Sequence, residues 1–352
     1  MKSARIETFT TRAEDIELRE VEPPQPARGQ VLVRMHMAPV NPSDFNYVEG
    51  TYQSAFSRLI WNHGADRPAA QLGNPPFAWP PYALGVEGVG TVMSAGGGLL
   101  ARRLVGKRVA VVGGPPNGTW QEMALIDAQR AFPVSRRLSD EQACAFFVNP
   151  LTALILVRQL LRVPRGAVLL QTAAGSALCG MVRNLARADG FRVIDVVRSQ
   201  AGAERLRSAG STDVIALESE NLVAAVHRLC PGGVSFVLDA VAGPTGSEAA
   251  RCLAPGGRMV CYGTLSGEPL SIPPRDLMMP MTRIEGFYLP VYLESKSLWR
   301  RLSLVRANAK LIAEGILDTP VARVYPLDSL HEALAHARRP GRAGKVLLDM
   351  RS

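Results

Sequence analysis

The feature that most constrains the fold is an alternation of short apolar segments with helical segments that begins near residue 140. Five short segments are predicted to be strands, the first of them buried: Ala167–Gln171, Phe191–Val197, Asp213–Ile215, Val234–Asp239 and Arg258–Tyr262. The segments between them have helical spacing: Leu178–Ala188, Ala203–Ala209, Leu222–Leu229 and Thr245–Cys252. Strands that alternate with helices in this way are typical of a parallel, doubly wound sheet, so we expect an α/β fold.

The first part of the chain has a different pattern. Strands are predicted at Val31–Met37, Gly85–Val92 and Arg108–Val112, with glycine and proline turns between them. These short strands indicate a compact β-barrel-like domain. Residues 54–81 are expected to form an irregular loop near a ligand, with a short helix at Ala55–Trp61. Ser139-Asp140-Glu141-Gln142 resembles a helix start, and Thr152–Leu161 is expected to be a further helix.

The expected domains are residues 1–138 as the β-rich domain, completed by 296–352, and 139–295 as the doubly wound domain. The length of 352 residues suits two domains. The last part of the chain is expected to end on a strand at Lys345–Met350.

Charge and composition exclude several classes of protein. The net charge is +9, but the basic residues are scattered and accompany no nucleic-acid-binding module, so no nucleic-acid partner is predicted. A modest positive field suits an anionic cofactor or a thioester substrate. The five cysteines include no C-x-x-C pair, which argues against a disulfide framework. No apolar run approaches the ~18 residues of a membrane span, and no signal-peptide core is present, so a cytoplasmic location is expected.

The turn after the first predicted strand is the candidate dinucleotide site. The segment Val168–Gly180 lies between a strand and a helix, where such a turn must lie. The G-x-G-x-x-G pattern is absent, but the turn keeps small residues that let the backbone approach a pyrophosphate. The predicted contacts here are Thr172, Gly175, Ser176, Ala177 and Leu178.

The end of the second predicted strand distinguishes between the two nicotinamide dinucleotides. NAD-binding folds place an acid there to bind the ribose hydroxyls, but this chain has Val197 followed by Arg198. A fixed cation matches a 2′-phosphate, which favours NADPH over NADH. The alternative is that Arg198 is a solvated surface residue. Asp195 lies within the strand and is not assigned to the ribose.

The order of these parts resembles the medium-chain dehydrogenase/reductase superfamily, and within it the zinc-free 2-enoyl thioester reductases of the mitochondrial type. The resemblance covers nearly the whole chain and is carried by motifs in the expected order. They are Asn41-Pro42-Ser43-Asp44 with Gly50-Thr51-Tyr52, Gly85-Val86-Glu87-Gly88-Val89-Gly90, Asn149-Pro150-Leu151-Thr152-Ala153, Val196-Val197-Arg198, Tyr262-Gly263 and Glu285-Gly286-Phe287-Tyr288-Leu289. It implies a GroES-like β-barrel catalytic domain and a Rossmann cofactor domain.

The resemblance also implies roles for individual residues. Tyr52 matches the family's catalytic tyrosine, with Tyr47 as its nearest rival and a packed loop tyrosine as the structural alternative. Asn41 is expected to orient Tyr52 or the substrate, unless it only forms an Asn-Pro turn. Thr152 matches a hydroxyl near the nicotinamide, unless it is simply a helix-start threonine. Further cofactor contacts are expected at Asn149, Ser199, Gln200, Tyr262, Gly263, Phe287, Tyr288, Leu289 and Lys345, although Lys345 also fits a solvated strand-edge lysine.

A zinc site is not expected. The zinc alcohol dehydrogenases of the superfamily have Gly-His-Glu where this chain has Gly85-Val86-Glu87, and valine cannot bind zinc. No cysteine precedes Cys144, so the family's four-cysteine lobe is missing.

The predicted activity is reduction of the carbon–carbon double bond of an α,β-unsaturated carbonyl compound, with a 2-enoyl thioester of coenzyme A or a carrier protein as the expected substrate. The alternatives are a quinone or enone reductase on the same scaffold and a non-catalytic NADPH-binding regulator. A homodimer is expected, because Met281–Leu293 resembles the strand-rich segment that pairs sheet edges across a two-fold axis.

Overall fold

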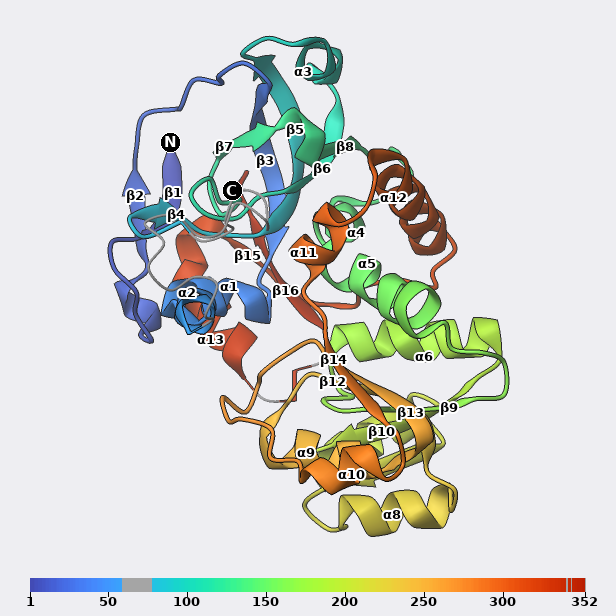
Figure 1. Cartoon of the computed structure of the whole chain (residues 1–352). Helices are drawn as coiled ribbons and strands as arrows, with labels where there is room; N and C mark the ends of the chain where they lie inside the picture. The colour runs from blue at the N-terminus through green and yellow to red at the C-terminus, as the bar shows by residue number, and fades with distance from the viewer. Residues whose placement is uncertain (59–77, 340, 343, 352) are drawn as a thin grey trace. The chain divides into compact units, whose positions relative to one another are not determined.

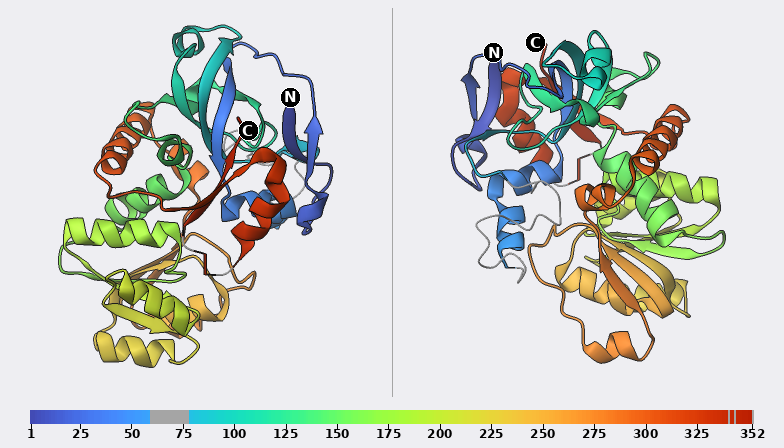
Figure 2. Two further views of the ribbon diagram at one scale, coloured as in Figure 1. Left: turned by 180° about the vertical axis from the view of Figure 1, so that it is seen from behind. Right: turned by 45° about the horizontal axis from the view of Figure 1, so that its top comes forward.

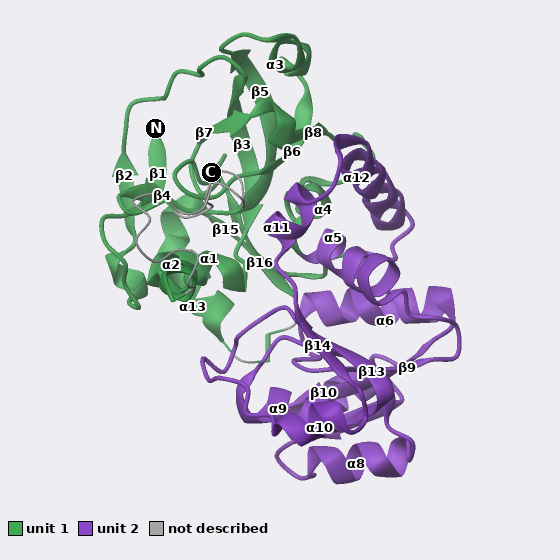
Figure 3. Cartoon of the chain, in the orientation of Figure 1, with its two compact units in different colours: residues 1–148, 318–352 green, residues 149–317 purple. Residues whose placement is uncertain are grey.

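The computed structural model describes residues 1–58, 78–339, 341–342 and 344–351, so most of the predicted loop at 54–81 lies outside the described residues. The chain divides into two compact units, residues 1–148 with 318–352 and residues 149–317 (Figure 3). Both boundaries lie later than the predicted ones. Residues 139–148 remain with unit 1 because Glu87 accepts hydrogen bonds from the Phe147 and Val148 amides. Residues 296–317 remain with unit 2, where the Asn184 side chain donates to the Ile316 carbonyl.

Unit 1 contains a seven-stranded sheet in the order β15-β16-β3-β5-β6-β8, with β7 also paired to β3. Its strands are β3 (Gln30–Pro39), β5 (Glu87–Ala95), β6 (Arg108–Val112), β7 (Met123–Asp127), β8 (Ala131–Pro133), β15 (Val321–Pro326) and β16 (Lys345–Asp349). A second sheet has the order β2-β1-β4 and is formed by β1 (Lys2–Ile6), β2 (Glu17–Glu20) and β4 (Tyr82–Ala83). Strand β16 pairs antiparallel with β3, so segments from the first and the last parts of the chain are paired in one sheet (Figure 2).

The helices of unit 1 flank these sheets. They are α1 (Pro42–Glu49), α2 (Thr51–Ser57), α3 (Leu99–Leu104), α4 (Asp140–Cys144) and α13 (Leu330–Arg338), with 3-10 turns at Ala13–Asp15, Ala128–Arg130 and Leu327–Ser329. Helices α1 and α2 are joined at Gly50, whose φ of 69° lies in the left-handed region that glycine tolerates. The core between the sheets and helices includes the fully buried side chains of Trp120, Tyr82, Ile6 and Met35.

Unit 2 is built on a six-stranded, parallel sheet in the order β11-β10-β9-β12-β13-β14. The strands are β9 (Val168–Gln171), β10 (Arg192–Val197), β11 (Asp213–Ala216), β12 (Val234–Asp239), β13 (Leu253–Cys261) and β14 (Arg283–Gly286). The order reverses between β9 and β12, as in a Rossmann fold. The predicted α/β fold with a GroES-like domain and a parallel-sheet domain is therefore confirmed.

The helices of unit 2 follow the expected alternation (Figure 1). They are α5 (Val148–Leu154), α6 (Ala177–Asp189), α7 (Gln200–Ser208), α8 (Leu222–Leu229), α9 (Gly243–Arg251), α10 (Pro274–Met278), α11 (Leu289–Glu294) and α12 (Leu298–Ala313). Helix α5 continues as a π-helical segment over Ile155–Leu161, within the predicted helix 152–161.

One predicted segment has a different structure. Residues 281–293, expected to be rich in strands, contain only β14, after which α11 begins at Leu289. Pro290 falls in the first turn of that helix, where proline is favoured, and ends the extended stretch.

Candidate functional site

Most of the predicted cofactor residues of unit 2 lie at one edge of its sheet. Residues 172–178 follow β9, 198–200 follow β10, 262–263 follow β13 and 287–289 follow β14. Because these strands are parallel, their carboxyl ends share one edge, and ligands of such sheets bind there at the point where strand order reverses. Asn149 and Thr152 instead lie on α5, where Thr152 is buried.

The backbone of the turn after β9 is accessible to a ligand at the start of α6. The Ser176 hydroxyl accepts a hydrogen bond from the Cys179 amide and so caps the helix. A Cβ atom placed on Gly175 would meet no atom within 4 Å, so packing inside the chain does not require glycine there. An exposed, side-chain-free position next to a helix N-terminus fits the approach of a pyrophosphate, as the sequence predicts.

Thr172 has a structural role at this edge. Its hydroxyl donates to Asp239 Oδ1 at 2.6 Å and accepts from the Ala240 amide at 3.0 Å. Asp239 also accepts from the Val241 and Ala242 amides and thereby orders the loop after β12. Sequence reasoning missed Asp239. The signal that could have identified it is its position as the last residue of the predicted strand Val234–Asp239.

Arg198 and Asp195 have contrasting surroundings at the second strand. Asp195 is buried, and its Oδ1 accepts from Gln171 at 2.6 Å and from Arg183 at 3.1 Å. Arg198, directly after the strand, is exposed and forms no ion pair with any residue that the structure describes. The end of β10 therefore presents a cation and no acid of its own, which fits a 2′-phosphate.

The residues after Arg198 begin α7. The Ser199 hydroxyl accepts from the Gly202 amide, and the Gln200 amide donates to the Glu218 carboxylate at 3.0 Å. The backbones of Arg198 and Glu218 are also hydrogen-bonded, so an acid of the neighbouring loop stands close to the predicted phosphate position.

The remaining predicted contacts follow β13 and β14. Gly263 is required by packing, because a Cβ atom there would lie 2.7 Å from the Ala240 carbonyl. The Tyr262 hydroxyl lies 3.7 Å from Cys179 Sγ, and burial raises the pKa of Tyr262 well above its usual value. Phe287, Tyr288 and Leu289 are half-buried, and Tyr288 precedes the first residue of α11.

In unit 1, the two candidate tyrosines lie together on α1 and α2. The rings of Tyr47 and Tyr52 are 5.0 Å apart in an edge-on arrangement. Tyr47 is buried and its carbonyl accepts from the Tyr82 hydroxyl, whereas Tyr52 is half-buried. Burial raises the pKa of Tyr52, which keeps this phenol protonated at neutral pH.

Asn41 and Lys345 belong to a buried polar network. The Lys345 ammonium donates to Asn41 Oδ1, and Asn41 Nδ2 donates to Glu87 Oε1 at 3.1 Å. Both ends of the Asn41 amide are therefore used inside unit 1, which favours a positioning role over a substrate contact. Lys345 is buried rather than solvated at a strand edge, and its predicted cofactor contact stays a prediction.

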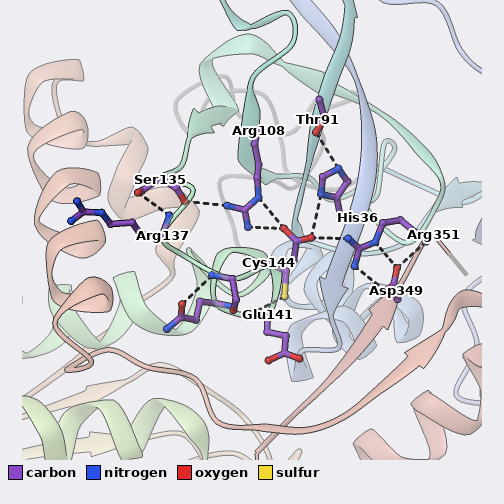
Figure 4. Close-up of polar contacts among 12 residues, drawn as sticks. His36, Thr91, Arg108, Ser135, Arg137, Glu141, Cys144, Asp349 and Arg351 are labelled. Atoms are coloured by element: carbon purple, nitrogen blue, oxygen red, sulfur yellow. Dashed lines mark hydrogen bonds and ion pairs between the residues drawn. The ribbon is translucent and has the colours of Figure 1, made fainter.

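A second polar cluster attaches α4 to the sheet of unit 1 (Figure 4). Asp140 accepts two hydrogen bonds from Arg108 and one from Arg351, and lies 3.4 Å from His36 Nδ1. Burial opposes ionisation of Asp140, but Arg108, His36 and Arg351 together lower its pKa. Each member has a partner within the cluster, so these residues stabilise α4 and the end of the chain.

Two features bear on metals and membranes. Within the described ranges, no group of three or more His, Cys, Asp or Glu side chains is arranged to bind a metal ion. Val86, at the position of the zinc-binding histidine, is a buried apolar side chain. The part of the chain that the structure describes contains no helix of the length and apolarity that crossing a bilayer requires.

Both units match families known from other proteins. Residues 27–136 match the family described as alcohol dehydrogenase GroES-like domain, and residues 177–303 match the family described as zinc-binding dehydrogenase.

Two relatives are similar in sequence to this chain over most of its length. The mitochondrial enoyl-[acyl-carrier-protein] reductase of Caenorhabditis elegans is 30% identical over 75% of this chain and 70% of its own. The chain belongs to the medium-chain dehydrogenase/reductase family. A second relative, the mitochondrial enoyl-[acyl-carrier-protein] reductase of Dictyostelium discoideum, is 27% identical over 91% of this chain and 86% of its own.

Solved structures of the medium-chain dehydrogenase/reductase family share the fold. The Escherichia coli quinone oxidoreductase complexed with NADPH superposes with a TM-score of 0.83, covering 99% of this chain and 100% of its own at 23% identity. The predicted assignment to this family, and to an oxidoreductase within it, is confirmed.

Proposed function

We propose that this protein is a zinc-independent, NADPH-dependent reductase of the carbon–carbon double bond of an α,β-unsaturated carbonyl compound, and that its substrate is a 2-enoyl thioester. The observation that carries the proposal is Tyr52, a half-buried phenol kept protonated by burial, in a chain related to enoyl reductases. The Caenorhabditis elegans and Dictyostelium discoideum relatives are enoyl-[acyl-carrier-protein] reductases by name, which supports this substrate class.

The proposed cofactor rests on the edge of the unit 2 sheet. Gly175 leaves space for a pyrophosphate at the N-terminus of α6, where amides and the helix dipole attract anions. The exposed Arg198 guanidinium can bind a 2′-phosphate. Strand β10 does not end in an acid that would accept hydrogen bonds from a free ribose hydroxyl. The E. coli quinone oxidoreductase, which has the same fold, was solved with NADPH. When bound, NADPH supplies the hydride that adds to the β-carbon.

We propose that residues of this chain stabilise the negative charge that develops on the substrate and deliver the proton that the product requires. Negative charge develops on the carbonyl oxygen as the β-carbon is reduced, and the α-carbon must then receive a proton. Tyr52 can donate a hydrogen bond to that oxygen or supply the proton, because its hydroxyl remains protonated at neutral pH. Asn41 is held by Lys345 and Glu87 directly before α1 and so positions the start of the segment that carries Tyr52.

The experiment that tests this function is NADPH oxidation measured with crotonyl thioesters, enones and quinones. We expect the highest kcat/KM with a thioester. A preference for quinones or simple enones would assign the chain to the alternative activity, and no oxidation with any of them would support a non-catalytic NADPH-binding protein.

Replacing Tyr52 with phenylalanine tests the proton donor. The change removes one hydroxyl and should leave fold and NADPH affinity unchanged, while kcat on the best substrate falls by about 10²–10⁴-fold, the usual contribution of a positioned acid. Tyr47→Phe is the matched control, since it removes the neighbouring hydroxyl and is expected to retain turnover. The opposite result for the two variants would transfer the role to Tyr47.

Three finer predictions accompany this proposal. Elemental analysis is expected to find no stoichiometric zinc, and activity should persist in chelator. The cytoplasmic location and the homodimer remain predictions from the sequence.

A further inference from the structure

The turn after β9 contains an alanine in an uncommon backbone conformation. Ala173 has a φ of 49°, in the left-handed region that side chains other than glycine rarely adopt. Such a residue persists only where its surroundings hold it. On one side, the Thr172 amide donates to the Leu238 carbonyl at 3.0 Å. On the other side, the Ala174 amide donates to the Val196 carbonyl at 3.0 Å, so the sheet fixes both flanks of the turn.

One charged side chain also binds this turn. The guanidinium of Arg183, from α6, donates through Nη1 to the Ala174 carbonyl at 2.9 Å. The same nitrogen donates to Asp195 Oδ1 of β10 at 3.1 Å. Arg183 therefore connects the turn to the neighbouring strand, and its position is set by a carboxylate on one side and a peptide carbonyl on the other.

Asp195 is the anchored member of this pair. Its side chain is 1% exposed, whereas that of Arg183 is 15% exposed. Asp195 Oδ1 also accepts from Gln171 Nε2 at 2.6 Å, and the same Gln171 nitrogen donates to the Cys179 carbonyl of α6 at 3.2 Å. The acid is thus held by the end of β9 and by the first turn of α6 at once, and it orients Arg183 from a fixed point.

The hydrogen bond from Arg183 determines the direction of an amide. The Ala174 carbonyl and the Gly175 amide belong to one planar, trans peptide group, in which the C=O and the N–H point in opposite directions. A donor on the carbonyl therefore fixes where the Gly175 N–H points, and a charged donor also polarises the peptide. Gly175 is exposed, and its amide donates to no other group among the residues that the structure describes.

We propose that Arg183, oriented by Asp195, is a positioning residue that directs the Gly175 amide at the pyrophosphate of the nicotinamide cofactor. The inference rests on the proposed function, because it takes the turn after β9 as the pyrophosphate site. The pyrophosphate is common to NADPH and NADH, so the pair serves both cofactors equally. In this respect it differs from Arg198, whose proposed ligand is the 2′-phosphate.

The test compares cofactor affinity with fold stability in the whole protein. Arg183→Met removes the guanidinium and keeps a long side chain. The Kd values for NADPH and NADH should both rise about tenfold, and by the same factor, because a charge-assisted hydrogen bond is lost. This variant also leaves Asp195 buried without its cation, which lowers Tm. Adding Asp195→Asn removes that charge, so the double variant should regain most of the lost Tm while both Kd values stay raised.

Hydrogen exchange tests the same contact without any cofactor. In the double variant, the Ala174 and Ser176 amides, which are hydrogen-bonded in the wild-type turn, should exchange about tenfold faster by NMR. Arg187→Met is the matched control on the same helix. Arg187 is exposed and donates to Asn184 Oδ1 at 2.8 Å, so its loss should change neither the Kd values nor the exchange of the turn.

Three results would overturn the proposal. They are wild-type Kd values in the double variant, unchanged exchange at Ala174 and Ser176, and a loss of affinity confined to NADPH, which would place Arg183 on the 2′-phosphate. A wild-type protein that binds neither cofactor would instead refute the proposed function, and the exchange rates would still report whether the pair orders the turn.

Discussion

At the scale of single residues, surroundings decide the role of each charge in this chain. Asp195 and Arg198 are three positions apart, yet the acid is buried against Arg183 and Gln171 while the cation faces solvent. A buried, paired aspartate stabilises the sheet, whereas an exposed, unpaired arginine at the cofactor edge has its charge available for a ligand.

Replacing Arg198 with alanine should therefore weaken NADPH binding much more than NADH binding. Loss of a charge-assisted contact to a phosphate should cost on the order of 1.5–3 kcal/mol, which is about 10–150-fold in Kd. Titration calorimetry or fluorescence with both cofactors measures this. Arg187→Ala, on the last turn of α6, is the control and should change neither affinity. Equal affinity of the wild type for NADPH and NADH would contradict the assignment.

The residues that sequence reasoning could identify are those with a local signal. Arg198 follows a predictable strand, and Gly175 and Ser176 lie in a predictable strand-to-helix turn. The hydrogen-bonded network of Asn41, Glu87 and Lys345 had no such local signal, because Asn41 and Lys345 are 304 positions apart and its members meet only through the pairing of β16 with β3 and of β3 with β5. Long-range burial of this kind follows from tertiary structure and not from any local pattern.

At the scale of elements, helix α4 shows how far a local pattern can predict structure. The predicted start at Ser139 is observed: the Ser139 hydroxyl accepts from the Gln142 amide, and the Gln142 side chain accepts from the Ser139 amide. This reciprocal capping depends only on residues three positions apart, which explains why it was predictable. Residues 281–293 were less predictable, because short apolar runs suit a strand and a helix alike.

Replacing Ser139 with alanine should loosen α4. Loss of an N-cap oxygen costs about 1 kcal/mol, so the amides of the first turn of α4 should exchange hydrogen about fivefold faster. Ser139→Thr retains an accepting oxygen and should preserve slow exchange. Unchanged exchange in the alanine variant would mean that the contacts of Asp140 with Arg108 and Arg351 alone hold the helix.

At the scale of the whole molecule, the unpaired edge of the unit 2 sheet is the expected site of self-association. Strand β14 is the last strand in the sheet order, and Met278, Met279 and Met281 beside it are 70–81% exposed. Exposed methionines next to an open strand edge are characteristic of an interface and not of a solvated surface.

A homodimer at micromolar concentration is therefore expected by light scattering. Met279→Lys with Met281→Lys should shift the population toward monomer, since two charges would have to be buried at the interface. Leu99→Lys, at an exposed leucine of unit 1, is the control and should leave the dimer intact. A monomeric wild type would refute the predicted assembly.

The discontinuity of unit 1 has a consequence for synthesis on the ribosome. All of residues 149–317 leave the exit tunnel before β15 and β16, so the unit 2 sheet can be completed while β3, already able to pair with β5 and β7, still lacks β16. At about 5–20 residues per second, the roughly 200 residues between residue 148 and β16 take on the order of 10–40 s to translate. During that interval the end of β3 that pairs with β16 is unpaired, and Asn41 and Glu87 lack the buried Lys345 that completes their hydrogen-bonded network. Translation speed and chaperone access in this interval should therefore control the yield of folded protein.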